Sequence, residues 1–153
     1  MGKVVMYCDG SSNGKVGDGG YGAVIMNDKK ILKISGYNAN ATNNTEELRA
    51  AIFALRALKY PCEVEAFLDS QYVINGFEKN WVKNWKRNGW KSSTGDPVKN
   101  KELWIELDIE VAKHKITWRW VKGHAGNYYN EMVDKLAKDA KNTKKGVHTY
   151  EDL

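Results

Sequence analysis

The order of apolar strands and amphipathic helices constrains the fold of this chain more than any other feature. Three strands are predicted first, over residues 4–8, 21–26 and 31–37, and the turn at 27–30 joins the last two as an antiparallel hairpin. Strands and helices then alternate, with strands over 63–68 and 116–121 and helices over about 44–59, from 70, and over 81–87, 101–113 and 131–140. A meander followed by alternating elements predicts an α/β domain in which helices pack on a mixed sheet.

The composition indicates one folded domain that is neither secreted nor bound to a membrane. The chain has 153 residues, 42% of them hydrophobic, and six tryptophans, which is enough for a core and too many for disorder. No apolar run is long enough to span a bilayer, and the chain reaches Asp9 too soon for a secretory signal. Cys8 and Cys62 alone form no disulfide framework, which predicts reduced thiols and a cytoplasmic location. The net charge of +5 suits a polyanionic partner and equally suits an ordinary soluble protein.

Four carboxylates stand where predicted elements begin or end. They are Asp9 and Asp69, each at the end of an apolar strand, Glu47 at the opening of a helix, and Asp134 one turn into the last helix. If their strands are adjacent and parallel, Asp9 and Asp69 lie side by side at the carboxyl edge of the sheet. A single aspartate at a strand end is more often a turn former or a helix cap. Four acids in one place, however, repel one another unless cations lie between them, so together they predict two hard divalent metals and phosphoryl chemistry on a nucleic acid.

Two adjacent glutamates open the first helix, and their positions separate their roles. With Asn43 as the N-cap, Glu46 stands at the third helical position, where it can close a capping box. Glu47 lies four residues before Ala51, on the stripe that faces the core. We therefore assign the chemistry to Glu47. The last helix is predicted to be capped by Asn130.

Six short segments form a recognisable ordered set. They are YCDGS at 7–11, GGYGA at 19–23, TNNTEEL at 42–48, DSQYV at 69–73, NWKRNGW at 84–90 and VKGHAG at 121–126. In this order and spacing they resemble ribonuclease H of the bacterial type (type 1), over essentially the whole chain from about Val4 to Ala140. One segment alone would be weak evidence, whereas the ordered set is specific.

The resemblance implies a ribonuclease H-like α/β fold and an activity. The fold would be a five-stranded mixed sheet, with a three-strand antiparallel meander plus two parallel strands, flanked by helices and carrying a basic handle protrusion. The catalytic domain would cover 1–141, and 142–153 would be a C-terminal tail whose order is left open. The family cleaves the RNA strand of RNA–DNA hybrids, which implies a monomeric endonuclease that leaves 5′-phosphate and 3′-hydroxyl ends. The residues that would hold two Mg²⁺ ions, with Mn²⁺ as a substitute, are Asp9, Glu47, Asp69 and Asp134.

The resemblance also implies roles for a histidine and for polar loop residues. His124 matches the family's loop histidine, which would move protons or help the product to leave. Asn44 and Gln71 are the best placed to detect 2′-hydroxyls, and Asn13 and Asn43 lie in the same loops. Asn43 is also the predicted helix cap, so its share in substrate binding is smaller.

Two further groups would hold the DNA strand. The handle would place flat rings on sugars and cationic groups on phosphates, through Trp81, Lys83, Trp85, Lys86 and Arg87. Trp90 is more simply explained as part of a small satellite core. Thr42 and Asn100 match the family's pocket for a DNA phosphate. Many relatives place an arginine shortly before that threonine, but residues 38–41 contain none, which predicts a weaker pocket.

Two alternative functions stay open at this point. The first is a module that binds hybrids without cutting them, against which the four intact carboxylates argue because only metal would justify their repulsion. The second is another polynucleotide nuclease on the same fold, against which the handle, Asn44 and Gln71 argue. A nucleotide-binding loop is rejected, because the glycines at 10–22 lack a Gly-Lys-Ser/Thr ending and lead into a strand.

Overall fold

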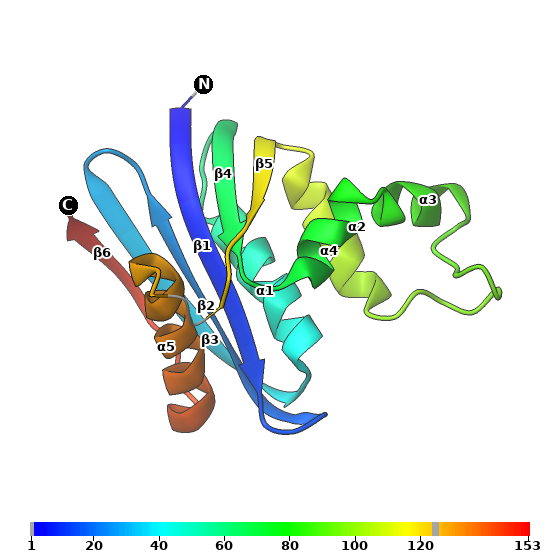
Figure 1. Ribbon diagram of the computed structural model, residues 1–153, viewed down its shortest axis with the longest axis horizontal. Helices are drawn as coiled ribbons and strands as arrows, with labels where there is room; N and C mark the ends of the chain where they lie inside the picture. The colour runs from blue at the N-terminus through cyan, green and yellow to red at the C-terminus, as the bar shows by residue number, and fades with distance from the viewer. Residues whose placement is uncertain (1, 124–125) are drawn as a thin grey trace.

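The chain folds around a six-stranded mixed sheet, and the computed structural model describes residues 2–123 and 126–153 (Figure 1). β1, β2 and β3 form the predicted antiparallel meander, β4 runs parallel to β1, and β5 runs parallel to β4. This confirms the predicted fold class. Across the sheet the strands are β5 (Lys115–Trp120), β4 (Cys62–Leu68), β1 (Gly2–Ser12), β2 (Gly17–Met26), β3 (Lys30–Ala41) and β6 (His148–Asp152).

Helices cover both faces of the sheet and form a protrusion on one side. α1 (Asn43–Arg56) packs on one face and α5 (Tyr128–Thr143) on the opposite face (Figure 1). α2 (Gln71–Glu78) and α4 (Lys101–Val111) lie on the β5 side, and α3 (Trp81–Arg87) with the loop that follows it extends farthest from the sheet. We call residues 81–100 the handle. Among the helices of the described ranges, none combines the length and apolar character needed to cross a membrane.

The sixth strand, β6, lies in the segment that was predicted as a tail, and it pairs antiparallel with β3. All five of its residues are exposed, so the segment lacks the alternation of buried apolar residues by which strands are predicted. Backbone pairing holds it instead, together with hydrogen bonds between Ser35 and Val147 and an ion pair of 3.0 Å between Lys33 Nζ and Glu151 Oε2. The prediction of five strands missed β6 for this reason.

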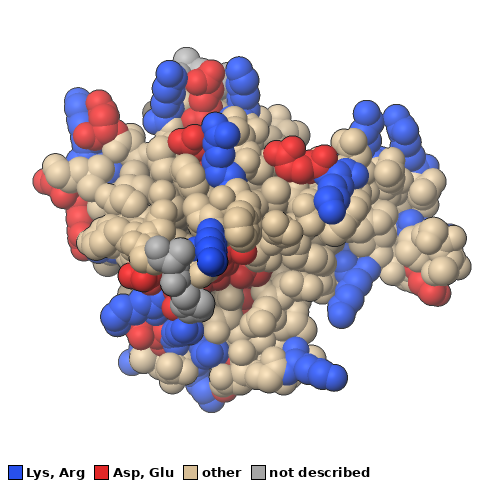
Figure 2. All heavy atoms as spheres, in the orientation of Figure 1, with Lys and Arg blue, Asp and Glu red and all other residues tan. Residues whose placement is uncertain are grey.

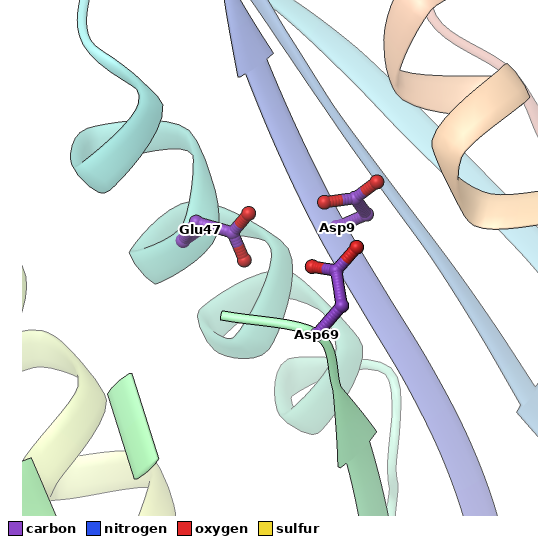
Figure 3. A group of neighbouring side chains, drawn as sticks. All are labelled: Asp9, Glu47 and Asp69. Atoms are coloured by element: carbon purple, nitrogen blue, oxygen red, sulfur yellow. The ribbon is translucent and has the colours of Figure 1, made fainter. Parts of the chain in front are cut away.

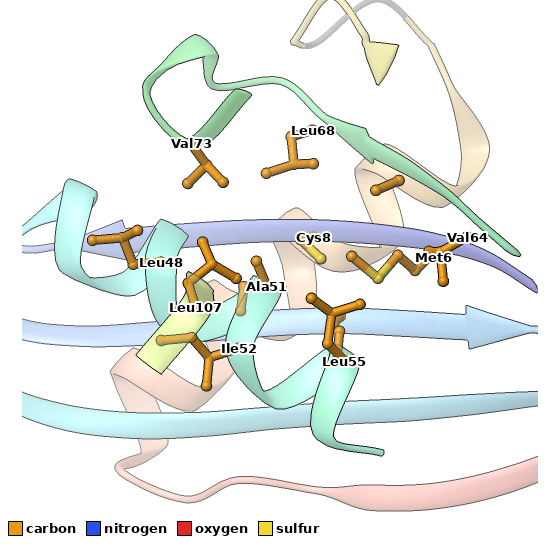
Figure 4. Packing of buried hydrophobic residues seen from close by; sticks show 14 of the residues in the cluster. Met6, Cys8, Leu48, Ala51, Ile52, Leu55, Val64, Leu68, Val73 and Leu107 are labelled. Carbon is orange, nitrogen blue, oxygen red and sulfur yellow. The ribbon is translucent and has the colours of Figure 1, made fainter. Parts of the chain in front are cut away.

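The sheet divides the core into two layers, because successive side chains of a strand point to opposite faces. Met6 and Cys8 of β1 are buried in the layer that includes α1 (Figure 4). Tyr7 lies in the other layer with α5, where its ring stacks on Phe67 at a centroid distance of 4.6 Å. Full burial of a large apolar side chain contributes about 1.5–3 kcal/mol relative to exposure. By the same alternation, Asp9 lies on the α5 face of the sheet.

Apart from Gly14, the glycines at 10–22 belong to the first two strands themselves, because β1 and β2 continue toward each other until Ser12 pairs with Gly19. The sequence predicts a flexible, close-packed link at these glycines; the close packing is confirmed, but most of the residues pair as strand instead of forming a link. These positions lack side chains because helices press on them. A Cβ on Gly10 would lie 2.4 Å from the backbone nitrogen of Glu47 in α1, and a Cβ on Gly22 would lie 2.7 Å from the carbonyl oxygen of Val133 in α5. Glycine thus lets both helices approach the strand pair closely.

The predicted helix caps were each misplaced. Thr42, and not Asn43, caps α1: its side chain accepts a hydrogen bond from the backbone N–H of Thr45 at 3.0 Å, and the Thr45 hydroxyl accepts one in return. α5 begins earlier than predicted, because Asn127 caps it by accepting a hydrogen bond from the backbone N–H of Asn130 at 3.0 Å. Threonine and asparagine are both good caps, so runs of such residues do not fix the first turn.

Candidate active site

Asp9, Glu47 and Asp69 converge at the carboxyl end of β4, where each offers an oxygen within 4.8 Å of the others (Figure 3). The parallel pairing of β1 and β4 accounts for two of them, since Cys8 lies opposite Leu68 and the two aspartates follow at the same level. Asp9 does not end its strand, as was predicted, because β1 continues past it against β2. β4 is the strand that ends here. The carboxylate cluster therefore lies where one strand of a parallel pair stops and its neighbour continues.

Glu47 reaches the cluster from the start of α1 and is almost completely buried. Its Oε1 accepts a hydrogen bond from the backbone N–H of Gly10 at 3.1 Å, and the same N–H also lies 2.9 Å from Asp9 Oδ1. Its Oε2 is buried without a hydrogen-bond donor among the described residues. Such an oxygen costs about 1–3 kcal/mol unless a positive group satisfies it. A cation between the carboxylates would satisfy it.

Glu46, next to Glu47, has a structural environment of its own. Its side chain is fully buried and forms an ion pair with Arg49 and a hydrogen bond of 2.8 Å with the amide of Asn38. It does not close a capping box, as was predicted, since Thr45 occupies that position. The conclusion that Glu47, and not Glu46, belongs to the chemistry agrees with this arrangement.

Burial, and then the charges of neighbouring acids, raise the pKa values of Asp9 and Glu47. The pKa of Asp9 rises to about 7, first because of burial and then because of the charges of Asp69 and Asp134, although the hydrogen bonds to Glu47 and Gly10 oppose the rise. Burial and the charge of Asp9 raise the pKa of Glu47 well above its ordinary value. Without a cation the cluster therefore favours protonated carboxyls, and a divalent cation would restore the charged forms.

Asp134 faces the cluster from α5 but lies outside the group of three. Its carboxylate is one of the charges that raise the pKa of Asp9. Its Oδ2 lies 3.0 Å from Lys138 Nζ, one helical turn later, and this contact raises the pKa of the lysine. The structure thus brings three of the four predicted acids together and places the fourth opposite them, paired with a lysine.

The residues at the end of β5 and directly after it lie beside the cluster. His124 lies outside the described residues, but Gly123 lies so near the site that a Cβ there would stand 3.2 Å from Asp69 Oδ2. The indole N–H of Trp120 donates a hydrogen bond of 3.0 Å to the backbone carbonyl of Asp69. The sequence motifs did not point to Trp120, Gly10 or Gly22 as residues of the site. Glycines inside a strand pattern were the available signal for the last two, since they mark close approach of another backbone.

The loop residues predicted to bind substrate lie near the carboxyl ends of the central strands. Asn13 is exposed in the β1–β2 turn, and Gln71 is exposed at the first position of α2. Asn43 and Asn44 open α1, and Asn43 Oδ1 accepts hydrogen bonds from the backbone N–H of Ser12 at 2.9 Å and from its hydroxyl at 3.1 Å. Asn43 therefore ties the start of α1 to the end of β1.

The side chains of the predicted phosphate pocket already have partners within the protein. Thr42 uses its hydroxyl to cap α1. Asn100 donates a hydrogen bond of 3.2 Å to the hydroxyl of Tyr72, which also accepts one from the indole of Trp104 at 3.0 Å. Asn100 has φ of 59°, in the left-handed region that asparagine tolerates.

The handle combines a small aromatic cluster with exposed basic groups. Trp85 packs edge-on against the buried Trp104 at a centroid distance of 5.4 Å, so it anchors the handle to the core. Its ring also lies 6.2 Å from that of Trp81 and 6.4 Å from that of Trp90. Figure 2 shows basic side chains projecting from this end of the molecule. The exposed basic residues of α3 are Lys83, Arg87 and Lys86, of which Lys86 pairs with Asp108 at 3.0 Å.

Solved structures with the same fold include two ribonucleases H. LC9-RNase H1, described as a type 1 RNase H with the type 2 active-site motif, has a TM-score of 0.86 at 31% identity, over 100% of this chain and 78% of that chain. LC11-RNase H1, solved in complex with an RNA/DNA hybrid, has a TM-score of 0.68 at 20% identity, over 92% of this chain and 98% of that chain, and shows similarity of fold alone.

Comparison of sequences confirms the resemblance. A ribonuclease H of Acetivibrio thermocellus is 52% identical over 147 residues, which cover 95% of this chain and 100% of that protein. The ribonuclease HI of Haemophilus influenzae is 49% identical over 136 residues, or 89% of this chain and 88% of that protein. The family model described as RNase H matches residues 1–142. The chain therefore belongs to the RNase H family.

Proposed function

We propose that this protein is a metal-dependent endonuclease that hydrolyses the RNA strand of RNA–DNA hybrids, leaving 5′-phosphate and 3′-hydroxyl ends. The observation that carries the proposal is the convergence of Asp9, Glu47 and Asp69 around a buried oxygen without a hydrogen-bond donor. Membership of the RNase H family supports the choice of substrate.

Two Mg²⁺ ions, or Mn²⁺ in their place, fit the donor set of the cluster. The candidate ligands are all carboxylate oxygens, which hard divalent cations prefer, and burial followed by the charges of neighbouring acids raises the pKa values of Asp9 and Glu47 without a cation. When bound, such ions stabilise charge on the phosphate and lower the pKa of bound water. The residues proposed to hold them are Asp9, Glu47, Asp69 and Asp134.

The protein's own contribution is to hold these carboxylates in place. The N–H of Gly10 orients Glu47 and Asp9 together, and the indole of Trp120 holds the backbone of Asp69. Cys8 is not a candidate nucleophile, because burial raises the pKa of its thiol and its side chain packs in the core layer with α1. Water is therefore the proposed nucleophile, and no side chain becomes covalently attached to the substrate.

Recognition of the hybrid is proposed to divide between the loops at the site and the handle. The groups proposed to contact 2′-hydroxyls are Asn13, Asn43, Asn44 and Gln71. Those proposed to hold the DNA strand are Trp81, Lys83, Trp85, Lys86 and Arg87, with a weak phosphate pocket at Thr42 and Asn100. His124 is proposed to move protons or to assist product release. We further propose that the protein acts as a monomer in the cytoplasm, in keeping with its two free cysteines, Cys8 and Cys62.

A panel of labelled nucleic acids tests the function directly. RNA–DNA hybrid, double-stranded RNA, single-stranded RNA and double-stranded DNA are incubated with the protein in Mg²⁺ or in EDTA. We expect cleavage of the RNA strand of the hybrid in Mg²⁺ alone. Asp9→Asn should lower kcat more than about 100-fold, since even partners of metal ligands cost 10–100-fold. Asp139→Asn is the matched control, because Asp139 is exposed and pairs only with Lys135 among the described residues.

The alternatives give different results in the same panel. Tight, salt-sensitive binding of hybrid without Mg²⁺-dependent cleavage would indicate a binding module. Equal cleavage of hybrid and double-stranded DNA would indicate another nuclease on this fold. If Asp9→Asn cleaved as fast as the parent, the assignment of metal ligands would be wrong.

A further inference from the structure

A row of lysines runs along one flank of α5, from the carboxylate cluster toward the β1–β2 turn. Lys138, Lys141 and Lys144 recur every three residues, so they follow one side of the helix and its C-cap. The buried residues Val133 and Ala137 face the sheet, and Lys141, one turn after Ala137 and partly buried, stands at the edge of that face. This lysine row takes no part in the function proposed above.

The contacts of the lysine row begin within α5 and then reach β1 and β2. The contacts join Lys138 Nζ to Asp134 Oδ2 at 3.0 Å, Lys141 Nζ to Ser11 Oγ at 3.1 Å, and Lys144 Nζ to Asp18 Oδ2 at 3.8 Å. Asp9 pairs with Gly22, Ser11 pairs with Gly20, and Asp18 lies beyond the last pair. At about 3.4 Å per residue, the row therefore extends along β1 for roughly 10 Å from the level of the carboxylates.

The two flanks of α5 differ in their charge balance. On one flank, Lys135 pairs with Asp139 at 2.8 Å, which neutralises both. In the lysine row, Lys141 has no carboxylate within ion-pair distance among the described residues and donates to a hydroxyl instead. Lys145 follows the row and is exposed. The row therefore carries net positive charge beside an acidic site.

A polyanion that must approach an acidic site needs positive charge around it. The handle supplies such charge on one side of the carboxylate cluster, and α5 lies on the other side of it (Figure 1). Basic side chains also gather at the lower left of the molecule in Figure 2, over the region of α5. A strand that crosses the cluster from the handle would continue over the lysine row.

We propose that the lysine row binds backbone phosphates of the strand that crosses the carboxylate cluster, on the side of the cluster opposite the handle. The identification of that strand as the RNA of a hybrid rests on the proposed function. The contacts are to phosphates, so the row positions the substrate and does not read its sequence. Lys141 and Lys144 are the residues that test it, because Lys138 contacts a residue of the proposed metal site.

The test measures binding of a fluorescent RNA–DNA hybrid in EDTA over a series of salt concentrations, so that metal loading has no influence. Lys141→Gln/Lys144→Gln should bind several-fold more weakly than the parent. The slope of log K against log salt should fall by about 0.9 for each phosphate that the variant no longer binds. Lys141→Arg/Lys144→Arg should keep the affinity and the slope of the parent. Thermal melting checks that each variant remains folded.

The control variant is Lys29→Gln/Lys135→Gln, which removes the same charge from exposed positions outside the row. If it weakens binding as much as the row variant, only the total charge matters and the proposal is wrong. Poly-glutamate is the second probe: if the row variant loses poly-glutamate binding but binds hybrid normally, the row serves an acidic protein instead. A parent that binds hybrid without cleaving it in Mg²⁺ would overturn the proposed function and leave this test intact.

Discussion

The carboxylate cluster and the handle are proposed to bind the same substrate, yet the fold holds them in opposite ways. In the cluster, main-chain packing sets the geometry: α1 approaches Gly10 so closely that a Cβ would lie 2.4 Å from a backbone atom, and one N–H orients two carboxylates. In the handle, a short helix displays exposed side chains and is anchored by Trp85 against Trp104. We therefore expect the cluster to tolerate almost no change and the handle to lose function gradually.

The largest difference should appear between the two adjacent glutamates. Glu47→Gln should lower kcat in Mg²⁺ more than about 100-fold, because a neutral amide is a poor ligand for a hard cation. The same change should raise the melting temperature in EDTA, since a buried amide beside Asp9 is neutral without having to take up a proton, whereas the carboxylate is not. Glu46→Gln should do the reverse: it weakens the pairing with Arg49, should cost about 1–3 kcal/mol of stability, and should leave metal binding intact. Kinetics, calorimetry with Mn²⁺ and thermal melting distinguish the two variants. Equal effects of both substitutions on kcat and on melting temperature would contradict the separate roles of Glu47 and Glu46.

The pH dependence of stability tests how strongly the carboxylate cluster shifts the pKa of Asp9. In the folded protein without metal the pKa of Asp9 is about 7, above its ordinary value of 3.8, so folding takes up a proton there. The resulting stabilisation is complete below about pH 4 and is lost as the pH rises through about 7. Asp9→Asn should therefore gain stability over the parent between about pH 5 and pH 8, on the order of 2 kcal/mol. Urea unfolding in EDTA measures the free energy of unfolding of both proteins. If the difference between them did not change with pH, the pKa of Asp9 would not be shifted by its surroundings.

Gly10→Ala tests whether main-chain packing sets the site. The added methyl group would meet the backbone of Glu46 and Glu47, so we expect a loss of about 1–3 kcal/mol and weaker binding of Mn²⁺. Gly2→Ala, in the same strand, is the control, because nothing lies within 4 Å of its Cβ. If Gly10→Ala lost stability but kept its metal affinity, the position of Glu47 would not depend on this contact.

The smallest effects are expected in the handle. Lys83→Gln and Arg87→Gln should each weaken hybrid binding by about 1 kcal/mol or less, without a change in melting temperature or in metal affinity. Lys86→Gln also breaks the pair with Asp108, so part of its effect should appear as lower stability. Hybrid binding over a series of salt concentrations and thermal melting of the three variants separate the loss of affinity from the loss of stability. A loss of kcat from any one of them as large as that of Glu47→Gln would remove the distinction between handle and cluster.

Much of the site could be predicted from the sequence because its residues stand at the ends of regular elements. Asp9 and Asp69 each follow an apolar run, and the parallel pairing of their strands is enough to bring them together. The apolar stripe of the first helix favoured Glu47 over Glu46, but both side chains are buried in the structure, and the ion pair with Arg49 is what distinguishes Glu46. The role of Asp134 was the hardest to predict from the sequence, since a position one turn into a helix does not fix which way the side chain points. In the structure Asp134 pairs with Lys138.

The features that the sequence did not reveal depend on main-chain contacts. β6 pairs through its backbone and exposes its side chains, so no hydrophobic pattern marks it. Glycine is common in loops, so the glycines at 10–22 do not indicate that β1 and β2 extend through them, whereas in the structure Gly10 and Gly22 allow helices to approach. The caps Thr42 and Asn127 were missed by one and three positions, since neighbouring residues have similar capping strength.

β6 also protects the long strand beside it. β3 spans Lys30–Ala41 and would otherwise present a row of free N–H and carbonyl groups over much of its length. Exposed strand edges of that kind pair with other molecules and promote aggregation. β6 is short, polar and fully exposed, with Glu151 and Asp152 near its end, which makes it a far poorer template for such pairing. β6 thus covers the edge of β3 from Lys30 to Ile34 with a short, charged strand, at the edge of the sheet away from the handle.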